Sequence, residues 1–161
     1  MTKAVFPGSF DPPTYAHLDI IERAASIFER LIVLVAENRK KEPLLKTEER
    51  AALLQNLLKE KKNVSVAFSA SLTVDFMKKE GCRVLVRGAR TINDFLFEQD
   101  LFRWNSFFEQ EIETVLFFPR ERYAHFSSSA VKELLAFGKD ISVITPPEVQ
   151  EALKNVLAFK I

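Results

Sequence analysis

The chain has 161 residues, of which 47% are hydrophobic and 28% charged. These values are typical of a globular protein and predict one domain over residues 1–161. The formal net charge of +1 does not favour binding to a polynucleotide, so any anion-binding site has to be local. One cysteine and two histidines are too few for an internal disulfide or a zinc cluster. No long apolar stretch opens the chain, so we expect no signal peptide or membrane span and a cytoplasmic protein.

The first predicted unit is a strand, a loop and a helix. Lys3–Phe6 is mainly apolar, and Pro7-Gly8 ends the strand. Pro12-Pro13 prevents a helix before Thr14, because proline lacks an N–H and disfavours the α region in the preceding residue. His17 then falls in the first turn of a helix, whose free N–H groups and dipole attract anions. A lone histidine there is commonly a satisfied polar residue, but the whole unit favours a phosphate site.

The next strand is predicted at Leu31–Ala36, a continuously apolar run typical of a strand covered on both faces of a parallel sheet. The basic segment Arg39–Lys41 follows its carboxyl end, where ligands bind in open α/β sheets, although such a run is ordinarily a solvated loop. A helix is predicted from Thr47, with Glu48 and Glu49 in its first turn.

Val64–Phe68 and Arg83–Arg87 are the third and fourth predicted strands, separated by a helix over Leu72–Glu80 that Gly81 ends. The fourth strand runs into the sequence Arg-Gly-Ala-Arg at 87–90. Either arginine alone could be a solvated charge. Two of them at a strand end, beside a glycine that admits a close backbone approach, predict a phosphate clamp, because guanidinium binds phosphate bidentately.

The helix predicted over Asn93–Glu109 is unusually aromatic, and its aromatic side chains point in several directions. One core face cannot cover them all, so we expect a homo-oligomer in which a second subunit does. Asp94, Glu98 and Asn105 form a polar stripe on this helix. The stripe could face an active site or water, and spacing alone does not decide between them.

The fifth predicted strand is Thr114–Phe118. After it, Ser127-Ser128-Ser129 begins a helix that ends near Gly138, and a last helix covers Glu148–Phe159. Serines at a helix start usually cap it, and three in succession after a strand also offer hydroxyl and N–H groups for a second anion site.

Five alternations of strand and helix predict an α/β fold, a Rossmann-like parallel five-stranded sheet with helices on both faces. The polar clusters at the strand ends then converge on one edge of the sheet. Because they include no evident nucleophile, they favour a transfer between two bound substrates.

Several motifs together resemble the bacterial phosphopantetheine adenylyltransferases of the nucleotidyltransferase superfamily. They are Pro-Gly-Ser-Phe-Asp-Pro at 7–12, Lys-Thr-Glu-Glu-Arg at 46–50, Arg-Gly-Ala-Arg at 87–90, Asp94-Phe95 with Glu98, Ser-Ser-Ser-Ala-Val-Lys-Glu at 127–133 and Pro-Pro-Glu-Val at 146–149. Residues 14–17 resemble the superfamily signature Thr/His-x-Gly-His, with Ala16 in place of its glycine. The resemblance implies adenylyl transfer from ATP to 4′-phosphopantetheine, giving dephospho-coenzyme A and pyrophosphate in coenzyme A biosynthesis. It also implies Mg²⁺ with ATP and a homohexamer.

The same resemblance assigns the site residues. Those implied to contact ATP are Ser9, Phe10, His17, Gly88, Ala89, Arg90, Glu98, Tyr123, Ala124, His125, Phe126, Ser127, Ser128 and Ser129. Those implied to hold 4′-phosphopantetheine are Ser9, Lys41, Thr73 and Arg87. His17, Lys41 and Arg90 are expected to stabilise the transition state by positive charge and hydrogen bonding, and no protein ligand to a metal is expected.

Two alternatives remain. Another small-molecule nucleotidyltransferase, such as a nicotinate-mononucleotide adenylyltransferase or a cytidylyltransferase, would share the motif of the first helix. A non-catalytic nucleotide-sensing α/β domain would keep the glycine turn and the serines but would need no second anion site.

Overall fold

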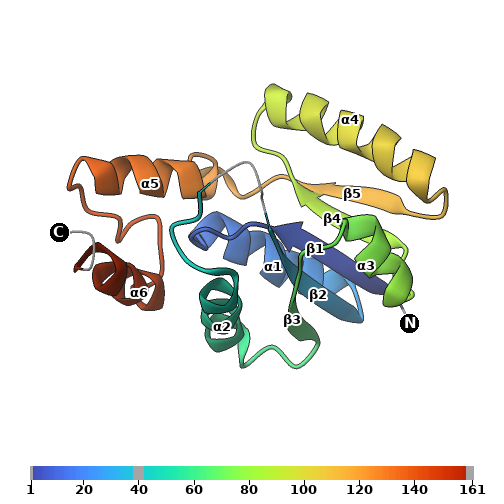
Figure 1. Cartoon of the computed structure of the whole chain (residues 1–161). Helices are drawn as coiled ribbons and strands as arrows, with labels where there is room; N and C mark the ends of the chain where they lie inside the picture. The colour runs from blue at the N-terminus through green and yellow to red at the C-terminus, as the bar shows by residue number, and fades with distance from the viewer. Residues whose placement is uncertain (1, 38–41, 159–161) are drawn as a thin grey trace.

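A parallel five-stranded sheet organises the chain, of which the computed structural model describes residues 2–37 and 42–158. The elements are β1 (Lys3–Gly8), α1 (Tyr15–Ile27), β2 (Arg30–Ala36), α2 (Thr47–Leu58), β3 (Val64–Ser69), α3 (Thr73–Lys79), β4 (Val84–Gly88), α4 (Ile92–Phe108), β5 (Glu113–Phe117), the 3₁₀ turn η1 (Glu121–Tyr123), α5 (Ser128–Ala136) and α6 (Pro147–Ala158). The strand order is β3-β2-β1-β4-β5, with every neighbouring pair parallel (Figure 1). The predicted α/β sheet is confirmed.

Helices pack on both faces of the sheet because successive strand residues point to opposite sides. On one face, Phe6 and Val33 belong to a core cluster with residues of α1 and α2. On the other face, Val5 and Ile32 pack with residues of α3, among them Met77. The chain runs outward from β1 to β3 and then returns to β4 on the other side of β1. Ligands of open α/β sheets bind where the strand order reverses in this way.

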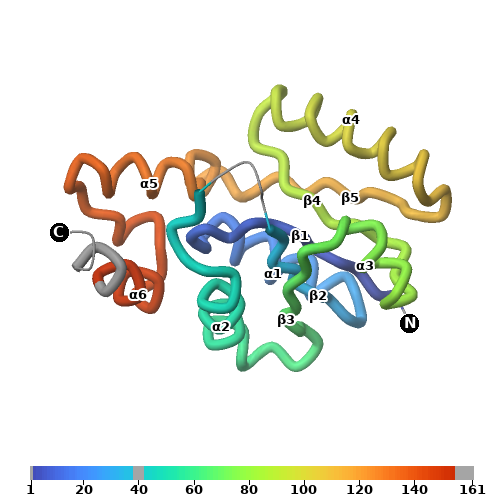
Figure 2. Tube along the Cα trace, viewed as in Figure 1, coloured from blue at the N-terminus to red at the C-terminus, as the bar shows by residue number. Residues whose placement is uncertain are grey.

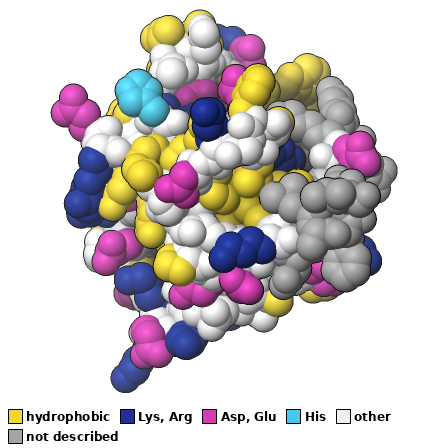
Figure 3. Space-filling view, turned by 90° about the vertical axis from the view of Figure 1, so that its left-hand side faces the viewer, with side chains coloured by type: hydrophobic (Ala, Val, Ile, Leu, Met, Phe, Trp, Pro, Cys, Tyr) yellow, Lys and Arg dark blue, Asp and Glu magenta, His cyan; other side chains and the backbone are white. Residues whose placement is uncertain are grey.

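A third apolar cluster joins the carboxyl-terminal helices to α2. Its buried members are Leu45, Val131, Ile141, Val149 and Leu153. Figure 2 shows the segment after residue 41 running from beside α5 down to α2. On the face formed by α5 and α6, basic and acidic side chains are interspersed around apolar ones (Figure 3). None of the described helices is long and apolar enough to cross a membrane.

Helix α4 is covered very little by the rest of the chain. Its single buried residue is Glu98, whereas Phe107, Trp104 and Phe97 are 77%, 62% and 59% exposed. The aromatic side chains therefore stay uncovered within one copy of the chain. The polar stripe, by contrast, is buried at Glu98, so at this residue it faces the rest of the chain and not water.

Two glycines at the strand ends let neighbouring side chains approach the backbone closely. A Cβ added to Gly8 would lie 2.9 Å from a ring atom of Phe10, and one added to Gly88 would lie 2.7 Å from Cδ1 of Ile20. The predicted helix-ending role of Gly81 and Gly138 is confirmed, since both have a positive φ, near 60°.

Candidate active site

A pocket of about 260 Å³ opens at the carboxyl ends of β1 and β4, where the strand order reverses. Its lining residues are Phe6, Pro7, Gly8, Ser9, Phe10, Ala16, His17, Ile20, Arg87, Gly88, Arg90, Pro119, Phe126, Ser127, Ser128 and Ser129. The predicted convergence is thus found for His17, Arg87 and Arg90, which come from α1, β4 and the loop after β4. The sequence analysis missed several apolar members of the lining, which carry no polar group to mark them.

His17 is held at the start of α1 by Thr14, the residue that precedes the helix. Its Nδ1 lies 3.0 Å from the backbone nitrogen of Thr14, which donates to it, and 3.0 Å from the Thr14 hydroxyl oxygen. Since Nδ1 accepts, the proton of the neutral ring sits on Nε2. The His17 ring also packs edge-on against Phe10, with the ring centroids 5.1 Å apart. His17 can therefore offer one oriented N–H donor to a ligand.

The electrostatic surroundings keep His17 uncharged. Burial, followed by the positive charge of Arg90, lowers the pKa of His17 from 6.5 to about 4. The sequence analysis expected positive charge together with hydrogen bonding from this residue. In the folded protein His17 supplies only the hydrogen bond at neutral pH, and the positive charge at this edge has to come from arginine and lysine side chains.

We expect the ring C–H signals of His17 to titrate in NMR with a midpoint near pH 4. Between pH 6.5 and 4 His17 is protonated in the unfolded chain but not in the folded one. The contribution of neutral His17 to the free energy of unfolding is therefore lost as the pH falls through this range. Arg90→Gln should raise the midpoint, because it removes one of the two causes of the shift. The signal is assigned by its loss in His17→Gln, and a midpoint of 6.5 would mean that the ring is solvated and charged.

The two arginines of the pocket are each paired with a carboxylate of α4. Arg87 donates from Nε and Nη2 to the two oxygens of Glu98, both at 2.7 Å, and from Nη1 to the Pro7 carbonyl at 3.1 Å. Arg90 Nε lies 3.3 Å from Oδ2 of Asp94. The same oxygen of Asp94 accepts from the Arg90 backbone nitrogen. The arginine pair predicted from the sequence is present, and each guanidinium is already oriented by the protein.

The three serines at the start of α5 have separate roles. Ser127 caps the helix, because its Oγ accepts from the Ala130 nitrogen at 3.0 Å. The Ser128 hydroxyl donates to the Pro12 carbonyl at 2.8 Å and so ties α5 to the loop before α1. Among the described residues the Ser129 hydroxyl has no hydrogen-bond partner, and Ser129 lines the pocket. Ser129 is therefore the serine whose hydroxyl remains for a ligand.

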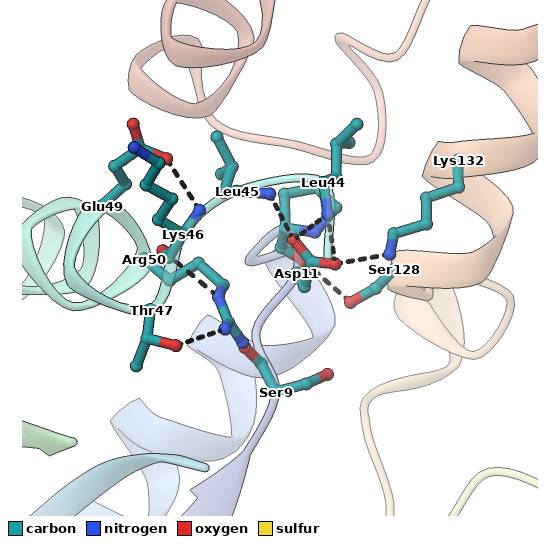
Figure 4. A network of polar contacts seen from close by, with 11 residues as sticks. Ser9, Asp11, Leu44, Leu45, Lys46, Thr47, Glu49, Arg50, Ser128 and Lys132 are labelled. Carbon is teal, nitrogen blue, oxygen red and sulfur yellow. Dashed lines mark hydrogen bonds and ion pairs between the residues drawn. The ribbon is translucent and has the colours of Figure 1, made fainter. Parts of the chain in front are cut away.

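Asp11 is the centre of a network that the sequence analysis did not find (Figure 4). Its buried carboxylate accepts from the backbone nitrogens of Leu44 and Leu45 at 2.9 Å and forms an ion pair with Lys132 of α5. One side chain thus holds together the loop before α1, the segment before α2, and α5 with its serines. The ion pair joins residues 121 positions apart, and no local pattern signals such a contact.

Arg50 of α2 extends this network toward the pocket (Figure 4). It is buried, and its guanidinium donates to the Ser9 carbonyl and, at 2.8 Å, to the Thr47 hydroxyl. The motif at 46–50 therefore positions the loop that follows Gly8 and does not itself line the pocket.

Several predicted site residues lie outside the pocket lining. Lys41 is outside the described residues. Thr73 begins α3, which follows the edge strand β3, two strands away from β1. The remaining five are Ala89, Glu98, Tyr123, Ala124 and His125. Of these, Tyr123 stacks on Tyr15, with ring centroids 6.3 Å apart.

The pocket lining contains no carboxylate, and the described residues hold no cluster of three or more His, Cys, Asp or Glu that could bind a metal ion. The chemistry of this donor set fits an anion.

Comparison with known proteins agrees with this arrangement. Residues 5–134 match the family model described as cytidylyltransferase-like. A phosphopantetheine adenylyltransferase of Symbiobacterium thermophilum is 46% identical over 158 residues, covering 98% of each chain. One from Limosilactobacillus reuteri is 44% identical over 157 residues, covering 98% of this chain and 91% of the relative. The fold resembles a solved Vibrio parahaemolyticus structure assigned as a nicotinate-nucleotide adenylyltransferase. The TM-score is 0.72 at 22% identity, and the match covers 96% of this chain and 93% of that one.

The match to the cytidylyltransferase-like family model over residues 5–134 identifies this α/β fold, with its anion-suited pocket at the switch point, as a nucleotidyltransferase. With near-complete coverage of relatives at more than 40% identity, the chain belongs to the phosphopantetheine adenylyltransferase family.

Proposed function

We propose that the protein transfers the adenylyl group of ATP to 4′-phosphopantetheine, giving dephospho-coenzyme A and pyrophosphate in coenzyme A biosynthesis. The observation that carries the proposal is that His17, Arg87 and Arg90 line a single pocket at the switch point of the sheet. A reaction between two anions needs such a place. The relatives named for this activity match the chain over almost its whole length.

The chemistry requires positioning and not an enzymic nucleophile. An oxygen of the acceptor phosphate attacks the α-phosphorus of ATP, the bond between the α- and β-phosphates breaks, and pyrophosphate leaves with the bonding electron pair. The acceptor is already an oxyanion, so no general base is needed. The barrier lies in bringing two anions together and stabilising the more negative transition state.

We assign the residues to this reaction as follows. The Nε2–H of His17 and the guanidinium of Arg90 stabilise charge that develops on the α-phosphate. Arg87 holds the acceptor phosphate, and Ser129 with the first turn of α5 faces the nucleotide phosphates. From the resemblance we retain Lys41 as a further cation for the acceptor, and Mg²⁺ accompanies ATP as part of the substrate.

The test is pyrophosphate release from Mg-ATP with each of three acceptors: 4′-phosphopantetheine, nicotinate mononucleotide, and none. Release with 4′-phosphopantetheine alone is the expected result. Release with nicotinate mononucleotide instead would indicate that the protein is a nicotinate-mononucleotide adenylyltransferase. ATP binding without release under any condition would favour a nucleotide sensor.

We also propose that the protein is a cytoplasmic homo-oligomer in which other copies of the chain cover the aromatic side chains of α4. The family resemblance implies a hexamer. The proposal rests on the exposure of Phe97, Trp104 and Phe107 on a helix with one buried residue. Light scattering after size exclusion measures the mass, and a monomer at micromolar concentration would contradict the proposal. Cell fractionation checks the cytoplasmic location, which recovery with membranes would contradict.

A further inference from the structure

Glu98 is buried for an electrostatic reason. It is the one buried residue of a 17-residue helix, and its side chain is 6% exposed. A buried carboxylate is stable only when it is paired and hydrogen-bonded. Here both of its oxygens accept from Arg87 at 2.7 Å. The ion pair between Glu98 and Arg87 therefore links helix α4 to the pocket. It occupies a position where an apolar side chain would ordinarily face the core.

The hydrogen bonds of Arg87 leave a defined pair of donors. A guanidinium has five N–H groups. Glu98 takes one on Nε and one on Nη2, and the Pro7 carbonyl takes one on Nη1. One N–H therefore remains on each terminal nitrogen. Arg87 lines the pocket, and its side chain is 22% exposed, so these two donors suit a phosphate.

We propose that Glu98 is a positioning residue, which acts on the acceptor phosphate through Arg87. This assignment rests on the proposed function and is separate from the ATP contact that the family resemblance implies. A free arginine side chain loses rotamer entropy when a ligand orders it. Glu98 fixes the guanidinium before the substrate arrives, so the phosphate meets donors that are already in place.

The first test is Glu98→Gln, which keeps the shape of the side chain but replaces one acceptor oxygen by an NH₂ that faces the donors of Arg87. We expect kcat/KM for 4′-phosphopantetheine to fall by about 10–10²-fold, a larger effect than any rise in the KM for ATP. Asp100→Asn is the matched control. It removes a carboxylate from the same helix, but Asp100 and its partner Arg103 are both exposed, so activity should stay unchanged.

A second variant and a double-mutant cycle separate positioning from support of the fold. Arg87→Lys keeps both charges but cannot form the two-pronged contact, and it should reproduce the loss with the acceptor even if Glu98→Gln folds poorly. In an Arg87→Ala background, Glu98→Gln should have no further effect on kcat/KM. Thermal unfolding of each variant checks the fold.

Two results would overturn the inference. One is a rise in the KM for ATP in Glu98→Gln that exceeds the effect on the acceptor. The other is a double variant whose loss of kcat/KM equals the product of the losses in the two single variants. Either would mean that Glu98 acts on the reaction independently of Arg87. Absence of pyrophosphate release from the unaltered protein would instead refute the proposed function, and this inference with it.

Discussion

His17→Ala is expected to lower turnover by about 10²–10³-fold, the usual loss when one oriented donor to a developing negative charge is removed. His17 is neutral, because burial and Arg90 hold its pKa near 4, and Thr14 fixes its ring by donating to Nδ1. The lost interaction is therefore the hydrogen bond from Nε2–H, and not a charge. Steady-state kinetics measure the effect, and thermal unfolding checks that the variant is folded.

Two further variants separate the contributions of the two ring nitrogens. In His17→Asn the side-chain oxygen can take the place of Nδ1 and accept from Thr14, but nothing replaces Nε2. In His17→Gln the longer amide can bring an N–H to the Nε2 position. We expect the asparagine variant to be as slow as His17→Ala but better folded, and the glutamine variant to regain part of the turnover.

The opposite pattern would assign a different role to this residue. If the asparagine variant turned over within a few-fold of the unaltered protein, His17 would matter only as the cap of α1. If all three variants kept normal turnover, His17 would have no part in the reaction.

The sequence predicted the fold well because its signals are local. Pro7-Gly8 and Pro12-Pro13 end a strand and delay a helix through the geometry of proline itself. Five alternations of strand and helix then leave few topologies other than a parallel sheet with right-handed crossovers. Once the strands are parallel, their carboxyl ends share an edge, and this places His17, Arg87 and Arg90 around one pocket.

The partners of these residues could not be predicted, because they are joined by the folded structure alone. Nothing in the sequence shows that Lys132 reaches Asp11, or that the polar stripe of α4 turns inward at Glu98. The charge state of His17 likewise depends on burial and on Arg90, which lies in another element. Spacing identifies candidate groups, whereas hydrogen-bond partners and pKa values depend on which elements pack together.

Asp11→Ala is expected to lower the free energy of unfolding by about 2–4 kcal/mol, because two backbone donors lose their shared acceptor. Lys132 adds less, since its side chain is 34% exposed and can be solvated. The change leaves the Leu44 and Leu45 backbone nitrogens and the Lys132 ammonium without the acceptor that they share. Each buried donor left unsatisfied costs about 1–3 kcal/mol. Urea unfolding measures the loss, with an unchanged m-value showing that the two-state transition is retained.

Two companion variants show which contact of Asp11 matters more. Asp11→Asn keeps one oxygen that can accept from Leu44 and Leu45, so it should be less destabilised than Asp11→Ala if the backbone contacts dominate. Lys132→Met removes the ammonium, keeps the apolar stem, and leaves the carboxylate with its two backbone donors. If it destabilises as much as Asp11→Ala, the ion pair dominates instead. A loss below about 0.5 kcal/mol in Asp11→Ala, the level of an ordinary surface substitution, would mean that the loop before α1 and helix α5 hold their places without the carboxylate, contrary to the arrangement in Figure 4.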